Sequence, residues 1–125
     1  MDNKKGGIGM YNEDIKRGDI LLVNFGSNRM GSLQCGIRYS LCLSNDQNNC
    51  YSSVIQVAPF TSQTKTRLPV HIEMDANWGL KKVSTLLLEQ LTVVSKMQII
   101  RKIGHIDSEE MMNEVDKRLK IQLGL

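Results

Sequence analysis

Before residue 107, apolar residues occur only in short runs, and this pattern limits the folds that the chain can adopt. Each run is bounded by glycine, proline or a cluster of polar residues that favour turns. Runs of this length are typical of β-strands rather than helices. The predicted strands lie at 20–25, 37–43, 53–60 (ended by Pro59), 68–74 and 84–91.

The last segment has the periodicity of a long helix. Asp107 can cap this helix with Glu110 three residues further on, and basic residues gather near its other end. Four apolar residues fall on one helical face and need a core or a partner to cover them: Met112, Val115, Leu119 and Leu123. A single helical turn is expected within 96–102, and an extended segment at 103–106.

About five strands, one terminal helix and no alternation of strands with helices predict a mainly β domain with a C-terminal α-helix. The expected architecture is a small, strongly bent antiparallel barrel with the helix packed against it. Residues 1–16 have no hydrophobic periodicity and are predicted to form a flexible N-terminal arm before a domain at 17–125. We expect translation to begin at Met10, because Lys5-Gly6-Gly7 matches what a translated ribosome-binding site would encode.

Composition narrows the functional classes only partly. The net charge of +3 suits a polyanionic partner without demonstrating one. Three cysteines without CxxC spacing predict neither a disulfide framework nor a zinc site. No apolar run approaches the roughly 20 residues that a membrane helix needs, so we expect a cytoplasmic protein.

No standard catalytic signature is present, and no metal or cofactor is expected. His71 is predicted to lie on the exposed face of its strand, and His105 has no partner motif around it. The loop at 26–36 contains polar donors for a phosphate or a base, although a solvated hairpin loop has the same composition.

Six short blocks in a fixed order nevertheless resemble one family. They are RGDI from residue 17, GSLQCGIR from 31, SND from 44, a strand ending at Thr61, LPVHIEMD from 68 and LLLEQL from 86. Together, over 17–125, they are similar to the MazF/PemK toxins. The resemblance implies an SH3-like barrel, usually a homodimer, that cleaves single-stranded RNA at short motifs without a metal and is restrained by the acidic segment of a cognate antitoxin.

The resemblance also implies roles for individual residues. Arg38 corresponds to the catalytic arginine of the family and Thr61 to its catalytic threonine, while Ser84 and Gln90 correspond to RNA contacts. A groove for RNA would also use basic side chains and loop donors, namely Arg29, Ser32, Gln34, Lys65 and Arg67, together with Lys81 or Lys82.

Two positions depart from the family pattern. Leu33 stands where the family often has glutamate, so a group that could accept a proton is missing there. Tyr39 replaces the usual proline, and its ring either packs internally or stacks on a base. Two other functions therefore remain open: a non-catalytic barrel toxin that binds a protein, like the CcdB gyrase poisons, or an inactive relative that only binds RNA or an antitoxin.

Overall fold

The computed structural model describes residues 14–27, 29–63 and 68–125. In these residues seven strands form one antiparallel sheet with the order β4-β5-β3-β2-β1-β7, and β6 pairs with β3 off this path. The strands are β1 (Asp19–Asn24), β2 (Ile37–Cys42), β3 (Val54–Thr61), β4 (His71–Met74), β5 (Ser84–Leu87), β6 (Thr92–Ser95) and β7 (Ile99–His105). The helices are α1 (Asp46–Tyr51) and α2 (Glu109–Leu123), with 3-10 turns η1 (Leu88–Gln90) and η2 (Lys96–Gln98).

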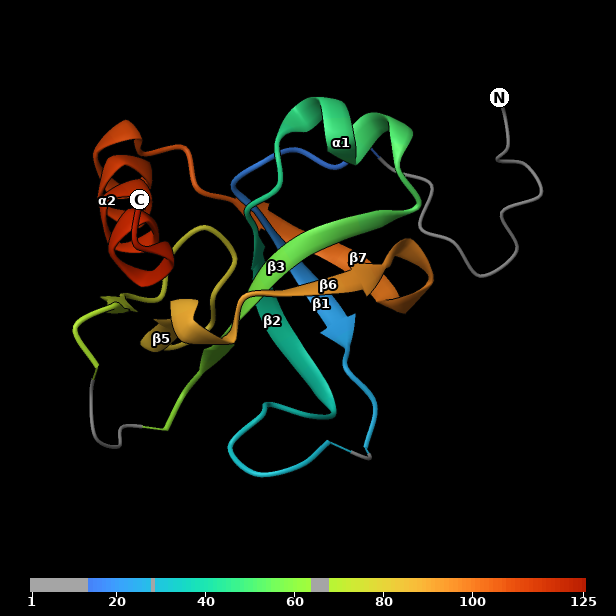
Figure 1. The fold of residues 1–125 in the computed structure, drawn as a ribbon, viewed down its shortest axis with the longest axis horizontal. Coiled ribbons are helices and arrows are strands. Elements are labelled where there is room, and N and C mark those ends of the chain that lie inside the picture. Colours follow the sequence, from blue (N-terminus) through green and yellow to red (C-terminus); the bar gives the residue numbers. More distant parts are fainter. Residues whose placement is uncertain (1–13, 28, 64–67) are drawn as a thin grey trace.

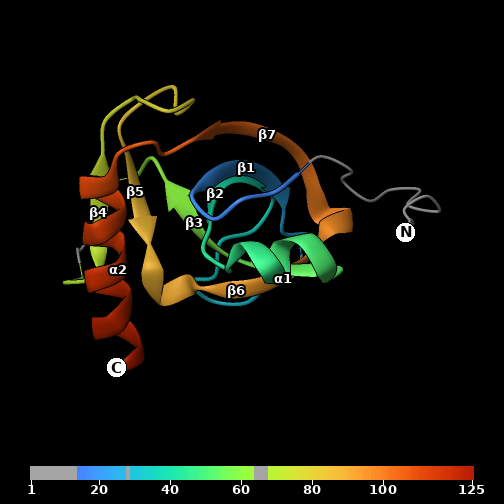
Figure 2. The same ribbon diagram turned by 90° about the horizontal axis from the view of Figure 1, so that it is seen from above.

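The long strand β3 divides the sheet into two parts. Its beginning pairs with β6, from Val54 opposite Ser95, and its end pairs with β5, with Thr61 opposite Thr85. The strands β6, β3, β2, β1 and β7 curl into a barrel-like layer that forms no β6–β7 ladder within the described residues (Figures 1 and 2). The predicted bent antiparallel sheet with a terminal helix is thus confirmed.

Two apolar clusters fill this fold. The larger one, the main core, lies under α2 and contains Ile20, Leu41, Phe60, Leu86 and Val115. The second core contains Ile15, Val23, Cys42, Ile55 and Val94. Ile15 is buried there with 2% exposure, so the packed domain includes this residue, which the sequence had assigned to the flexible arm. Residues 1–13 of that arm, with Met10, lie outside the described residues.

The helix α2 packs beside β4 and β5 (Figure 2). Val115 is fully buried, and Met112 and Leu119 pack against the main core, as the periodicity predicted. Leu123 is 52% exposed, so the apolar face extends beyond the core. The N-cap is Ser108 and not Asp107: the Ser108 hydroxyl accepts a hydrogen bond from the Met111 N–H, while Asp107 binds Trp78.

Several other elements differ from the predictions. The polar segment expected as a turn forms α1, which Asn45 caps by accepting from the Asn48 N–H at 2.8 Å. The single strand expected at 84–91 is interrupted by η1, and β6 follows as a separate strand. Strand β3 continues past Pro59 to Thr61, and the predicted helical turn is confined to η2 before β7 begins. No helix in the described residues is long and apolar enough to span a bilayer.

Candidate active site

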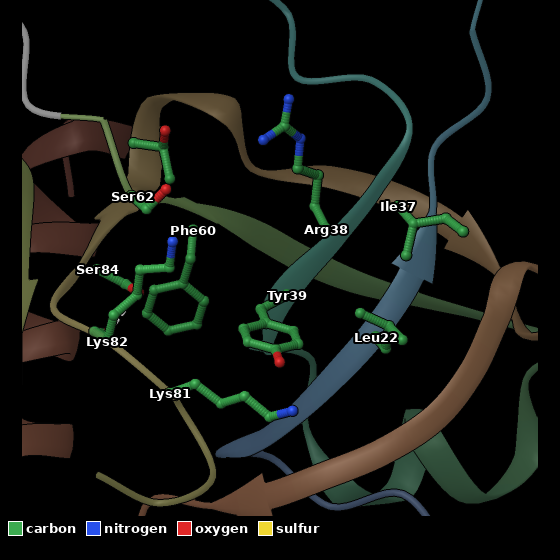
Figure 3. A pocket seen from close by; sticks show the side chains of 10 residues that line it. Leu22, Ile37, Arg38, Tyr39, Phe60, Ser62, Lys81, Lys82 and Ser84 are labelled. Atoms are coloured by element: carbon green, nitrogen blue, oxygen red, sulfur yellow. Dashed lines mark hydrogen bonds between the residues drawn. The ribbon is translucent and has the colours of Figure 1, made fainter. Parts of the chain in front are cut away.

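A pocket of about 230 Å³ opens where β2, the end of β3 and the start of β5 meet (Figure 3). Its walls contain three cationic side chains and several hydroxyl groups, and none of the described lining residues is acidic or a histidine. This composition suits an anion. The lining residues are Leu22, Ile37, Arg38, Tyr39, Phe60, Thr61, Ser62, Lys81, Lys82 and Ser84.

Arg38 is the second residue of β2 and reaches this pocket from the strand end. Its Nε donates a hydrogen bond to the Cys35 carbonyl at 2.9 Å, which fixes the plane of the guanidinium. Within the described residues, its two Nη groups have no hydrogen-bond partner. Because a guanidinium is always charged and presents its donors as a planar fork, Arg38 can bind two oxygens of one phosphate.

Thr61 reaches the same pocket from β3. The β2–β3 ladder ends with Ser40 opposite Pro59, and Arg38 and Thr61, each two residues beyond this pair, both line the pocket. The Thr61 Oγ1 accepts from the Gln63 N–H at 3.2 Å, so its own proton can be donated into the pocket. The structure therefore brings together the two residues that the resemblance named as catalytic.

Ser84 also lines the pocket, but its hydroxyl is engaged. It donates to the carbonyl of Lys82 at 2.9 Å, and the residue is only 5% exposed. Ser84 therefore holds the backbone that carries Lys82. Its hydroxyl proton is already donated, so towards a ligand the hydroxyl can act only as an acceptor.

Gln90 does not line the pocket. Its Oε1 accepts from the Gln34 N–H at 2.8 Å, and its Nε2 donates to the Ser32 carbonyl at 2.9 Å. Both ends of the carboxamide thus hold the loop at 26–36, which bears the predicted contact residues Ser32 and Gln34.

The same loop also anchors Arg29. Its Nη1 donates to the Gln34 carbonyl at 3.0 Å, and its guanidinium carbon lies 5.3 Å from the centre of the Phe25 ring. Gly26 and Gly36 close the base of the loop through a backbone hydrogen bond of 2.7 Å. None of these residues lines the Arg38 pocket. Lys65 and Arg67, the remaining predicted contacts, lie outside the described residues.

The sequence left open whether the Tyr39 ring packs internally or stacks on a base. Its ring packs against the main core, and the residue also lines the cavity beside Phe60. Ring packing is thus the observed role, with the hydroxyl left at the pocket. Leu33, the position without the family glutamate, is 45% exposed on the loop and does not line the pocket.

The two histidines are both engaged elsewhere. His71, predicted to be exposed, has a side chain that is only 10% exposed, and its Nε2 lies 2.9 Å from the Glu89 carboxylate. Its Nδ1 accepts from the Leu68 N–H. His105 lies 2.7 Å from the carboxylate of Asp19. The described residues hold no group of three or more His, Cys, Asp or Glu side chains that could bind a metal ion.

Comparisons with known proteins agree on one family. The sequence profile of the "PemK-like, MazF-like toxin of type II toxin-antitoxin system" matches residues 16–123. The chain is 41% identical over 113 residues to endoribonuclease EndoA of Bacillus subtilis (strain 168), which covers 89% of this chain and 96% of that relative.

Solved structures show the same fold. MazF from Deinococcus radiodurans aligns with a TM-score of 0.75 at 22% identity, covering 91% of this chain and 100% of that one. A mycobacterial endoribonuclease in complex with its cognate antitoxin aligns with a TM-score of 0.71 at 18% identity, covering 90% and 95% of the two chains.

Proposed function

The chain belongs to the PemK-like, MazF-like toxins of type II toxin-antitoxin systems, and we propose that it is a sequence-specific endoribonuclease that cleaves single-stranded RNA. The observation that carries this proposal is that Arg38 and Thr61 line the same cationic pocket. We further propose that it acts on mRNA in the cytoplasm.

The proposed reaction requires no metal. The 2'-hydroxyl oxygen of one nucleotide attacks the adjacent phosphorus, the bond from phosphorus to the 5'-oxygen breaks, and a 2',3'-cyclic phosphate remains. The 2'-hydroxyl loses its proton, and the departing 5'-oxygen gains one. Arg38 binds the non-bridging oxygens as negative charge develops on them, and Thr61 donates a further hydrogen bond. These two residues stabilise charge and do not act as the base.

The first proposed partner is a cognate antitoxin. Related toxins have been solved with their antitoxins, including MazE-MazF from Deinococcus radiodurans. We propose that the acidic segment of a cognate antitoxin covers the Arg38 pocket, since its lining is cationic and includes no carboxylate among the residues that the structure describes.

We also propose a homodimer. It is supported by exposed apolar side chains around β6 and its neighbours, where Val54, Val93, Met97 and Ile100 are between 38% and 62% exposed. Val93 lies opposite Gln56 on the outer face of the β3–β6 ladder, so part of this group shares one surface.

One observation favours a second candidate function. The pocket has no carboxylate or imidazole among its described lining residues, so it contains no side chain of the usual types that act as a base. A protein that binds RNA or an antitoxin without cutting would need only the same cationic side chains. No specific feature of the structure favours the gyrase-binding alternative.

A cleavage assay in EDTA separates these functions. The purified protein is incubated with a long RNA, and the fragment ends are mapped. Discrete cuts that end in 2',3'-cyclic phosphate support the proposal. RNA binding without cuts supports the non-cleaving relative, gyrase inhibition without either supports the protein-binding toxin, and cuts that EDTA abolishes contradict the metal-free reaction.

A further inference from the structure

The turn at residues 77–82, here called the lysine turn, has an unusual backbone. Trp78 has a φ of 54°, in the left-handed region that a bulky residue rarely adopts. Its N–H donates to the Asn77 side chain, and its indole Nε1 donates to Asp107 at 2.9 Å. The second bond ties the turn to the segment that leads into α2.

Close backbone packing fixes the turn further. A Cβ added to Gly104 on β7 would overlap the Trp78 carbonyl oxygen, and one added to Gly79 would lie 2.6 Å from the Ile103 carbonyl oxygen. Leu80 is buried in the main core with 4% exposure. The Ser84 hydroxyl binds the Lys82 carbonyl, so the turn is held at both ends. A strained backbone that its surroundings hold this firmly is a common feature of functional sites.

The lysine turn places two adjacent cations at the Arg38 pocket. In Figure 3 the two side chains diverge: Lys82 extends toward Ser62 and Phe60, whereas Lys81 extends toward Tyr39. Neither ammonium forms an ion pair within the described part of the chain. With Arg38, three positive charges therefore surround one small cavity, and an anion with more than one charge would relieve their repulsion.

Tyr39 supplies a neutral donor at the Lys81 end. Its ring is held by the main core, which fixes the direction of the hydroxyl. That hydroxyl has no hydrogen-bond partner among the described residues. Lys81 and Tyr39 thus form a donor pair on the opposite side of the pocket from Arg38 and Ser62 (Figure 3).

We infer that Lys81 and the Tyr39 hydroxyl bind a second RNA phosphate, next to the one that Arg38 and Thr61 hold. This inference rests on the proposed function. Single-stranded RNA carries one phosphate per nucleotide, so a strand crossing the pocket presents neighbouring anions to both sides. A second fixed phosphate would set the register of the strand and keep the scissile phosphate at Arg38.

The test measures binding to a short single-stranded RNA, centred on a mapped cut site or, if no cut is found, on the segment that the bound protein protects from chemical footprinting. The nucleotide that would attack carries 2'-deoxyribose, so the RNA cannot be cut. In two further RNAs an uncharged methylphosphonate replaces the phosphate on one side or the other of the scissile one. For the wild-type protein, one of these replacements should weaken binding about tenfold, the loss expected for a charge-assisted hydrogen bond.

The variants locate the contact. Lys81→Ala should weaken binding to the unmodified RNA about tenfold and remove most of the methylphosphonate effect, the remainder being the contact from Tyr39. Lys81→Arg should restore most of the affinity. Tyr39→Phe, which keeps the ring, should weaken binding about threefold. Lys117→Ala removes the same charge from an exposed site on α2 and should keep the full methylphosphonate effect.

The inference is overturned if Lys81→Ala binds like the wild type, if it keeps the full methylphosphonate effect, or if the wild type does not bind this RNA. Unchanged thermal midpoints show that the variants are folded. Cleavage by the wild type is scored separately with the all-ribose RNA. Absence of cuts together with the binding pattern above would refute the proposed catalysis and leave the phosphate site standing.

Discussion

Gln90 on η1 accepts a hydrogen bond from the backbone N–H of Gln34, which lies 56 positions earlier in the chain, at 2.8 Å. The same carboxamide donates to the carbonyl of Ser32. Gln90 thus holds the loop at 26–36 in place. We therefore expect it to influence RNA binding through the position of this loop.

Replacing Gln90 with alanine should therefore loosen this loop. Two hydrogen bonds are lost, each with a net value of about 1 kcal/mol. We expect the Gln34 amide to exchange with deuterium about tenfold faster or more, and RNA affinity to fall. Gln90→Glu keeps the acceptor for Gln34 and should protect that amide better than the alanine variant. Unchanged exchange at Gln34 in Gln90→Ala would contradict this role.

Asp19, the first residue of β1, is buried and connects β1 to β7 and to the segment that precedes β1. The residue is 2% exposed and binds the Lys16 N–H at 2.7 Å, His105 at 2.7 Å and Lys102 at 3.0 Å. Asp19→Asn leaves these donors without their charged partner and should lower the free energy of unfolding by about 3 kcal/mol.

A matched substitution checks that burial causes this loss. Asp116 pairs with Arg17 at 2.6 Å but is 44% exposed, so Asp116→Asn should cost less than about 1 kcal/mol. Urea denaturation measures both variants. Equal losses would show that the environment of Asp19 has no special importance.

Gly104 allows β7 to pass close to the lysine turn. In Gly104→Ala the added Cβ would overlap the Trp78 carbonyl oxygen, so the turn or the strand must move. We expect a loss of about 3 kcal/mol in the free energy of unfolding, together with weaker RNA binding. At Gly26, where φ is 83° but no atom lies within 4 Å of the added Cβ, alanine should cost only about 1 kcal/mol. A smaller loss at Gly104 than at Gly26 would contradict the close packing.

Cys42 should be unreactive in the folded protein. Burial raises the pKa of its thiol, and Cys50 in contrast is exposed. A thiol reagent near neutral pH should label Cys50 quickly and Cys42 only after unfolding. Because the folded state binds the Cys42 proton more tightly, this contribution to stability is complete below the pKa of the unfolded thiol and is lost as the pH rises through the higher folded value. Rapid labelling of Cys42 would contradict its burial.

Much of the fold was predictable because apolar spacing reports burial. The runs around Ile20 and Ile55 became β1 and β3, and Val115 became the buried centre of α2. Helix α1 could not be found in this way, since Asp46–Tyr51 is polar and has no apolar face. Its signal was the capping residue Asn45, which also fits a turn. The break at η1 was hidden because Leu88 is buried like a strand residue.

The site was predictable in part for a different reason. The resemblance named Arg38 and Thr61, and the structure shows that both line one pocket. Their catalytic roles remain predictions. The resemblance could not show that Ser84 and Gln90 are already bonded to the protein, since these bonds depend on the paths of two loops. Nor could it show that Lys81 and Lys82 both face the pocket, because that follows from the strained turn at Trp78.

The most direct test of the whole account is single-turnover cleavage of one mapped RNA in EDTA by the wild type, Arg38→Ala and Arg38→Lys. Arg38 makes one hydrogen bond within the described residues, to Cys35, so the alanine variant should fold normally. We predict that Arg38→Ala loses about 10²- to 10³-fold or more of the cleavage rate, and that lysine, which has no planar fork, restores little of it. A folded Arg38→Ala protein that cuts at the wild-type rate would contradict the account.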